Sequence, residues 1–99
     1  MPSMTATTVM TMDGVFYMDY HSTRVASYAQ KNGRVSLDTG GWKTATTKKR
    51  MNQFSRLFGL GFEVYQKDFE WFVSFPDDRE TIPFDGDKVV FYHYHYHCH

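Results

Sequence analysis

The chain has 99 residues, 41% of them apolar and 18% aromatic, which is enough to bury one core, and we expect residues 1–99 to form a single domain. Eleven basic and eleven acidic residues give a formal net charge of zero, and the single cysteine, Cys98, excludes an intramolecular disulfide framework. The first twelve residues have no basic region and no continuous apolar run, so we expect neither a signal peptide nor a membrane span, and a cytoplasmic protein.

The N-terminal part of the chain is predicted to form an arm and three strands. Residues 1–12 are rich in Thr and Met, and we favour a flexible arm for them over a first strand begun by Val9. The Asp13-Gly14 pair then predicts a turn, and Asn32-Gly33 is the strongest hairpin signal in the chain. Strands are predicted at residues 15–20, 23–30 and 34–37.

Residues 42–61, WKTATTKKRMNQFSRLFGLG, are the segment with a clear helical period. Spacings of three and four create an apolar stripe of Met51, Phe54, Leu57 and Phe58. This stripe predicts that the helix packs across one face of a sheet. We expect Thr44 or Thr46 to cap its N-terminus and Gly59 to end it in the left-handed conformation.

The C-terminal part is predicted to return to strands. Residues 62–66 and 69–75 flank a Lys67-Asp68 turn, and Pro83 indicates a short edge strand. The residues expected on the buried face are Phe62, Val64, Phe69, Trp71 and Val73. The predicted fold is therefore α+β, an antiparallel sheet of about five or six strands with one amphipathic helix on one face, in the order β-β-β-α-β-β-β.

The zero net charge hides a strong asymmetry along the chain. Residues 43–56 carry five basic side chains and no acidic one, whereas residues 57–99 carry eight acidic and three basic ones. Three cations lie in the first helical turns, where the helix dipole is already positive, so an anion or an acidic surface would stabilise them. We expect a basic and an acidic patch, with mutual neutralisation within the fold or across a dimer as the alternative.

The basic helix is the first candidate site, as a surface for nucleic acid. Lysine and arginine neutralise phosphates, and the side-chain amides of Asn52 and Gln53 have the paired donor and acceptor that reads an adenine edge. Trp42, Tyr65 and Trp71 can stack on bases but are predicted to lie in the core. The alternative is a solvated face of a packed helix. The predicted contacts are Lys43, Lys48, Lys49, Arg50, Asn52, Gln53 and Arg56.

The histidine-rich C-terminus, HYHYHCH, is the second candidate site. On a strand, alternate residues project to one side, so His93, His95 and His97 can reach the same Zn ion. A terminal His-rich tract also binds metal adventitiously. Apart from this zinc, we predict no cofactor. Nucleophilic catalysis has little support, because Cys98 is the penultimate residue and His21 lacks positioned partners, and we predict that the protein is not an enzyme.

Residues 37–73, LDTGGWKTATTKKRMNQFSRLFGLGFEVYQKDFEWFV, resemble segments of small uncharacterised bacteriophage proteins. The resemblance implies a phage accessory role in the host cell cytoplasm, and it does not include the histidine tail. Our primary prediction is a protein that binds nucleic acid through the basic helix. The alternative is a protein-interaction module or inhibitor of a host factor, which uses exposed aromatic side chains and the acidic residues 77–87. Metal binding is third. A homodimer is allowed and a membrane partner is not expected.

Overall fold

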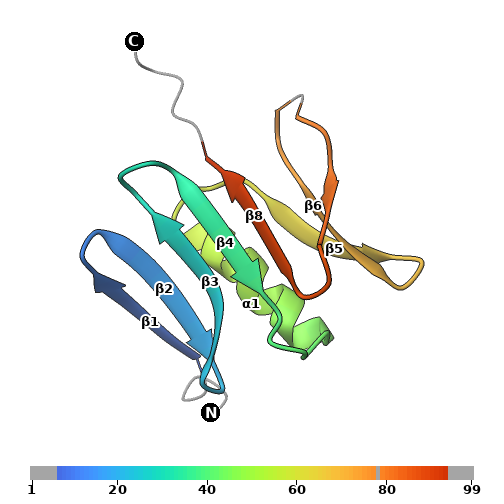
Figure 1. The fold of residues 1–99 in the computed structure, drawn as a ribbon, viewed down its shortest axis with the longest axis horizontal. Coiled ribbons are helices and arrows are strands. Elements are labelled where there is room, and N and C mark those ends of the chain that lie inside the picture. The colour runs from blue at the N-terminus through green and yellow to red at the C-terminus, as the bar shows by residue number, and fades with distance from the viewer. Residues whose placement is uncertain (1–6, 78, 94–99) are drawn as a thin grey trace.

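The computed structural model describes residues 7–77 and 79–93, which form one helix and two antiparallel sheets (Figure 1). The elements are β1 (Thr7–Met12), β2 (Val15–Tyr20), β3 (Thr23–Ala29), β4 (Arg34–Asp38), α1 (Ala45–Leu57), β5 (Glu63–Lys67), β6 (Glu70–Ser74), β7 (Ile82–Pro83) and β8 (Lys88–Tyr92). The strand orders are β1-β2-β3-β4-β8 and β5-β6-β7. The predicted α+β class with a helix on a sheet is confirmed, but the strands form two sheets and outnumber the five or six expected.

Strand β1 occupies part of the segment for which a flexible arm was expected. Its six residues pair with β2 without interruption, from Thr7 opposite Tyr20 to Met12 opposite Val15. The Asp-Gly turn folds the segment back onto β2, and Thr and Val suit a strand. The arm prediction is therefore wrong for residues 7–12, and residues 1–6 lie outside the described part of the chain.

Helix α1 begins and ends with the caps that the sequence predicts. The Thr44 hydroxyl oxygen accepts a hydrogen bond from the Thr47 N–H, 3.2 Å away. At the other end, the Leu60 N–H donates to the Ser55 carbonyl at 2.8 Å, and Gly59 has the positive φ of 65° that favours glycine.

The apolar stripe of α1 differs from the prediction at one position. Met51 and Phe54 are fully buried, and Phe58 packs on Phe16 of β2 with ring centroids 4.6 Å apart. Leu57 is 56% exposed, so its predicted place in the core is wrong. The buried face is centred on Thr47, Met51 and Phe54, which leaves Leu57 on the flank of the helix.

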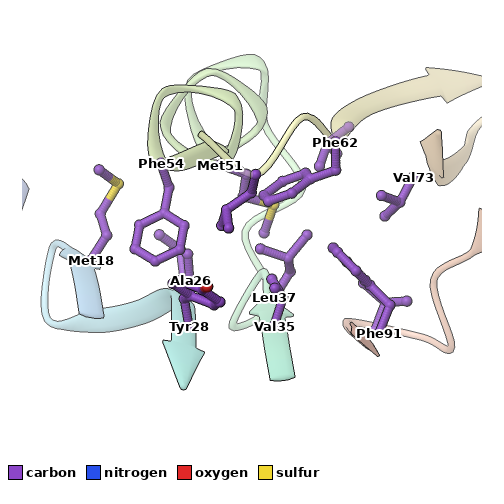
Figure 2. Packing of buried hydrophobic residues seen from close by; sticks show 14 of the residues in the cluster. Met18, Ala26, Tyr28, Val35, Leu37, Met51, Phe54, Phe62, Val73 and Phe91 are labelled. Atoms are coloured by element: carbon purple, nitrogen blue, oxygen red, sulfur yellow. The ribbon is translucent and has the colours of Figure 1, made fainter. Parts of the chain in front are cut away.

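The core lies between α1 and both sheets. Phe54 and Met51 point from the helix toward the five-stranded sheet, where Met18 and Leu37 are fully buried (Figure 2). Across the junction with the second sheet, the rings of Phe62 and Phe91 meet edge to face, with centroids 5.2 Å apart. Full burial of each such side chain contributes roughly 1.5–3 kcal/mol to folding, so this shared core holds the two sheets together.

The β5–β6 hairpin differs from the prediction in its turn. Lys67 pairs with Glu70, so Asp68 and Phe69 form the two-residue turn, where Lys67-Asp68 had been expected. Phe69 is 91% exposed and has a φ of 68°. Its predicted place on the buried face is therefore wrong, because the pairing puts it in the loop, whereas the other four predicted core residues of this region are buried.

Candidate nucleic-acid interface

None of the basic residues at positions 43–56 has a carboxylate partner among the described residues. The ion pairs seen within the described residues, Arg24–Asp19, Arg79–Asp77 and Lys88–Asp38, all lie outside positions 43–56. The Arg24 guanidinium donates a hydrogen bond to the Asp19 carboxylate, which raises the pKa of Arg24 and holds this cation across strands β2 and β3. Lys43, Lys49 and Arg56 are exposed, so the basic segment faces solvent without direct ionic neutralisation by the acidic C-terminal region.

Two of the predicted contact residues are held against the fold. The Lys48 ammonium donates to the side-chain oxygen of Gln66 at 3.1 Å and lies 5.5 Å from the centroid of the Trp71 ring. The Arg50 guanidinium donates to the side-chain oxygen of Gln53 at 3.2 Å. These contacts hold the Lys48 and Arg50 side chains against the fold, and the side-chain oxygen of Gln53 is already engaged.

Asn52 uses both halves of its amide within the fold. Its side-chain NH₂ donates to the Val64 carbonyl at 3.1 Å, and its side-chain oxygen accepts from the Val64 N–H at 2.7 Å. Strand β5 is the outer strand of its sheet, so Val64 lacks a strand on that side, and Asn52 takes the place of one. This pair of hydrogen bonds removes Asn52 from the candidate interface, because no donor–acceptor pair remains to read a base.

Trp42 is exposed beside the start of α1, which corrects its predicted place in the core. Its side chain is 64% exposed, and it borders a cavity of about 370 Å³ that Tyr20, His21 and Thr47 also line. Trp42 precedes the helix and belongs to no strand, so no periodicity predicts its environment. The one feature of the sequence that indicates an exposed Trp42 is its position between two glycines and Lys43, which is typical of a loop.

The loop that carries Trp42 is fixed by Thr39, which is fully buried. The Thr39 hydroxyl donates to the Asp87 carboxylate at 2.7 Å, and its N–H donates to the Asp87 carbonyl at 2.8 Å. The Trp42 N–H in turn donates to the Thr39 carbonyl at 3.0 Å. The indole therefore projects from an anchored loop.

The predicted zinc site lies mostly outside the described residues. His93 is half-buried, its N–H donates to the Gly33 carbonyl at 2.7 Å, and its ring meets Tyr28 edge to face. His95 and His97 fall in residues 94–99, which the structure does not describe. Over residues 7–77 and 79–93 no group of three metal-ligating side chains comes together, and zinc binding stays a prediction.

The comparisons with known proteins identify a phage family. The family model described as Kyanoviridae Gp96 protein matches residues 2–91, which include the segment whose resemblance to phage proteins was noted from the sequence. Searches of curated proteins and of solved structures found no match. Within the described residues, no helix has the length and apolar character needed to cross a membrane.

Proposed function

We propose that this chain, which belongs to the Kyanoviridae Gp96 family of phage proteins, is a non-enzymatic accessory protein that binds nucleic acid through α1 and the loop before it. One observation carries the proposal: five basic side chains lie within fourteen residues, and none pairs with a carboxylate in the described part of the chain. A phosphate backbone supplies the anions that such a surface lacks.

The exposed cations follow one side of the helix. Lys49 and Arg56 are seven residues apart, which is two helical turns, so they project in similar directions. Lys43 lies just before the N-terminus of α1, where the helix dipole adds partial positive charge. Phosphates that meet this surface gain from both the side chains and the dipole.

Trp42 favours single-stranded over double-stranded nucleic acid as the ligand. An exposed indole beside lysine can stack on an unpaired base, and such stacking is worth about 1–3 kcal/mol per base. The engaged amide of Asn52 weighs against reading of base edges in a major groove. We therefore propose binding that tracks the backbone and tolerates many sequences.

The test is a salt series of binding to labelled single- and double-stranded DNA and RNA, with metal-free protein. For three or four phosphate contacts to a single strand, the logarithm of the affinity should fall with the logarithm of salt with a slope of about −2 to −3. Trp42→Ala should weaken single-strand binding by about tenfold and leave the slope unchanged.

Charge reversal tests the location of the interface. Lys49→Glu combined with Arg56→Glu should abolish binding without changing the unfolding midpoint. The matched control is Lys31→Glu with Arg34→Glu, which reverses two exposed cations around the β3–β4 turn. Equal loss in both double variants would indicate nonspecific attraction, and absence of binding at about 50 mM salt would refute the proposal.

A protein-interaction module is the second candidate function, and Phe69 is the observation that favours it. A bulky side chain at positive φ strains the backbone, and this one is almost fully exposed at a hairpin tip. We propose that it is an aromatic anchor for an apolar pocket of a host protein. In pull-downs from host lysate, Phe69→Ser should remove a partner that the charge-reversed helix variant still retains, and a partner retained by both variants would contradict this role.

A further inference from the structure

The outer strands of the two sheets differ in how their free edges are protected. Unpaired strand edges attract other strands, so proteins usually cover them, shorten them or place charge or proline there. The edge of β5 is covered by Asn52, which bonds Val64, and β7 is two residues long and contains Pro83. On β8, the Arg79 guanidinium donates to the Tyr92 carbonyl at 2.7 Å.

Strand β1 has none of these protections within the described part of the chain. It is six residues long, TTVMTM, with no charge, no proline and no bulge in its pairing with β2. Among the described residues no backbone hydrogen bond reaches its outer side. Figure 1 shows β1 at the outer margin of the five-stranded sheet, away from α1. The described residues therefore leave this edge free for another strand.

We propose that β1 pairs antiparallel with β1 of a second copy of this chain, which joins the two five-stranded sheets into one. Met12 and Val15 flank a two-residue turn, so they form a hydrogen-bonded pair. Hydrogen-bonded pairs alternate along an antiparallel ladder, so the backbone N–H and C=O groups of Thr8, Met10 and Met12 point toward β2. Thr7, Val9 and Thr11 then direct their backbone groups outward. With a two-fold axis at Val9, Thr7 lies opposite the partner's Thr11, and every outward N–H and C=O has a partner.

Charge and apolar exposure both favour a second copy as the occupant. An uncharged strand meets no repulsion when it pairs with itself. Val9 lies opposite the buried Met18, so it is on the α1 side of the sheet. The Arg50 guanidinium lies 5.8 Å from the centroid of the Tyr20 ring of β2, so Arg50 is on the β2 flank of α1. Leu57 comes two helical turns after Arg50 and therefore lies on the same flank. Two-fold pairing therefore brings the exposed Val9 and Leu57 of both copies toward one apolar strip.

The test is the mass of the chain in solution over a concentration series, by light scattering after size exclusion and by sedimentation velocity. The native chain should reach twice the mass of one copy. Val9→Lys and Val9→Glu should each be monomeric, because the two-fold axis places like charges opposite one another. An equal mixture of these two variants should restore a mixed dimer, since residue 9 then faces the opposite charge.

The matched control is Val90→Lys. Val90 is 43% exposed on β8 of the same sheet and Val9 is 44% exposed, so the two substitutions perturb similar surfaces. Val90→Lys should leave the dimer intact. A native chain that stays monomeric at every soluble concentration would overturn the proposal, as would a dimer that persists in Val9→Lys. Recovery of the mixed dimer distinguishes loss of pairing from loss of folding, and the proposal does not depend on nucleic-acid binding.

Discussion

The β1–β2 and β5–β6 hairpins have the same local backbone but opposite surroundings. Each joins an outer strand to its neighbour through a two-residue turn, with φ values of 54° and 78° at Asp13 and Gly14 and of 51° and 68° at Asp68 and Phe69. The edge of β5 is closed by α1, whereas residues 7–77 and 79–93 place nothing on the edge of β1. The type of turn therefore does not determine whether the outer edge of a hairpin is covered. The position of the neighbouring helix does.

A polar stripe of α1 closes the β5 edge. Its members are spaced by four and three residues, and their partners descend β5 and its preceding loop two residues at a time: Lys48 to Gln66, Asn52 to Val64, and Ser55 to Phe62. The Ser55 hydroxyl donates to the Phe62 carbonyl at 2.8 Å and is buried. The helix thus replaces the missing strand with side chains.

The largest expected effect is at Asn52. Asn52→Ala leaves both the N–H and the C=O of Val64 without a partner, and we expect the free energy of unfolding to fall by about 2–3 kcal/mol. Chemical denaturation measures this. Gln53→Ala is the control, because it loses one hydrogen bond between side chains and leaves no backbone group without a partner, so it should cost less than about 0.5 kcal/mol. Equal costs would show that closure of the β5 edge contributes little to stability.

Local patterns predicted the elements whose determinants lie within a few residues. The helical period and the Thr44 cap predicted α1, and Asn32-Gly33 predicted the β3–β4 hairpin, whereas Asp13-Gly14 predicted a turn but not strand β1 before it. The closure of the β5 edge by Asn52, the exposure of Leu57 and the formation of a second sheet depend on which elements meet in space. A period of 3.6 identifies one apolar face but not its width, and it cannot show that a polar side chain replaces a strand.

The exposed cations of the candidate interface could be predicted from local charge. Lys49 and Arg56 on α1 and Lys43 before it are exposed, as a run of basic residues implies. Trp42 was missed, because a large aromatic residue outside any periodic segment is expected to be buried unless its neighbours are known. Asn52 was included because an amide at helical spacing looks the same in sequence whether it meets a base or a backbone.

Exchange of the turn residues should have a smaller effect than loss of Asn52. Phe69→Gly should raise the free energy of unfolding by about 0.5–1 kcal/mol, because glycine adopts positive φ without strain. Gly14→Phe should lower it by about 1 kcal/mol. A Cβ added at Gly14 meets no atom within 4 Å, and the positive φ of 78° strains any residue but glycine, so backbone strain is the expected cause. Both are measured by denaturant unfolding, and destabilisation by Phe69→Gly would contradict the exposure of this ring.

The smallest effect is expected at the open edge. Val9→Lys should change the free energy of unfolding of the single chain by less than about 0.5 kcal/mol, because the side chain is nearly half exposed and the substitution breaks no hydrogen bond. The measurement compares it with the native chain at dilutions where both are monomeric, so that pairing between copies makes no contribution. A cost close to that of Asn52→Ala would mean that the Val9 side chain is buried within one chain, which would contradict its exposure. A negligible cost together with loss of the dimer would mean that the β1 edge contributes to association and not to the fold.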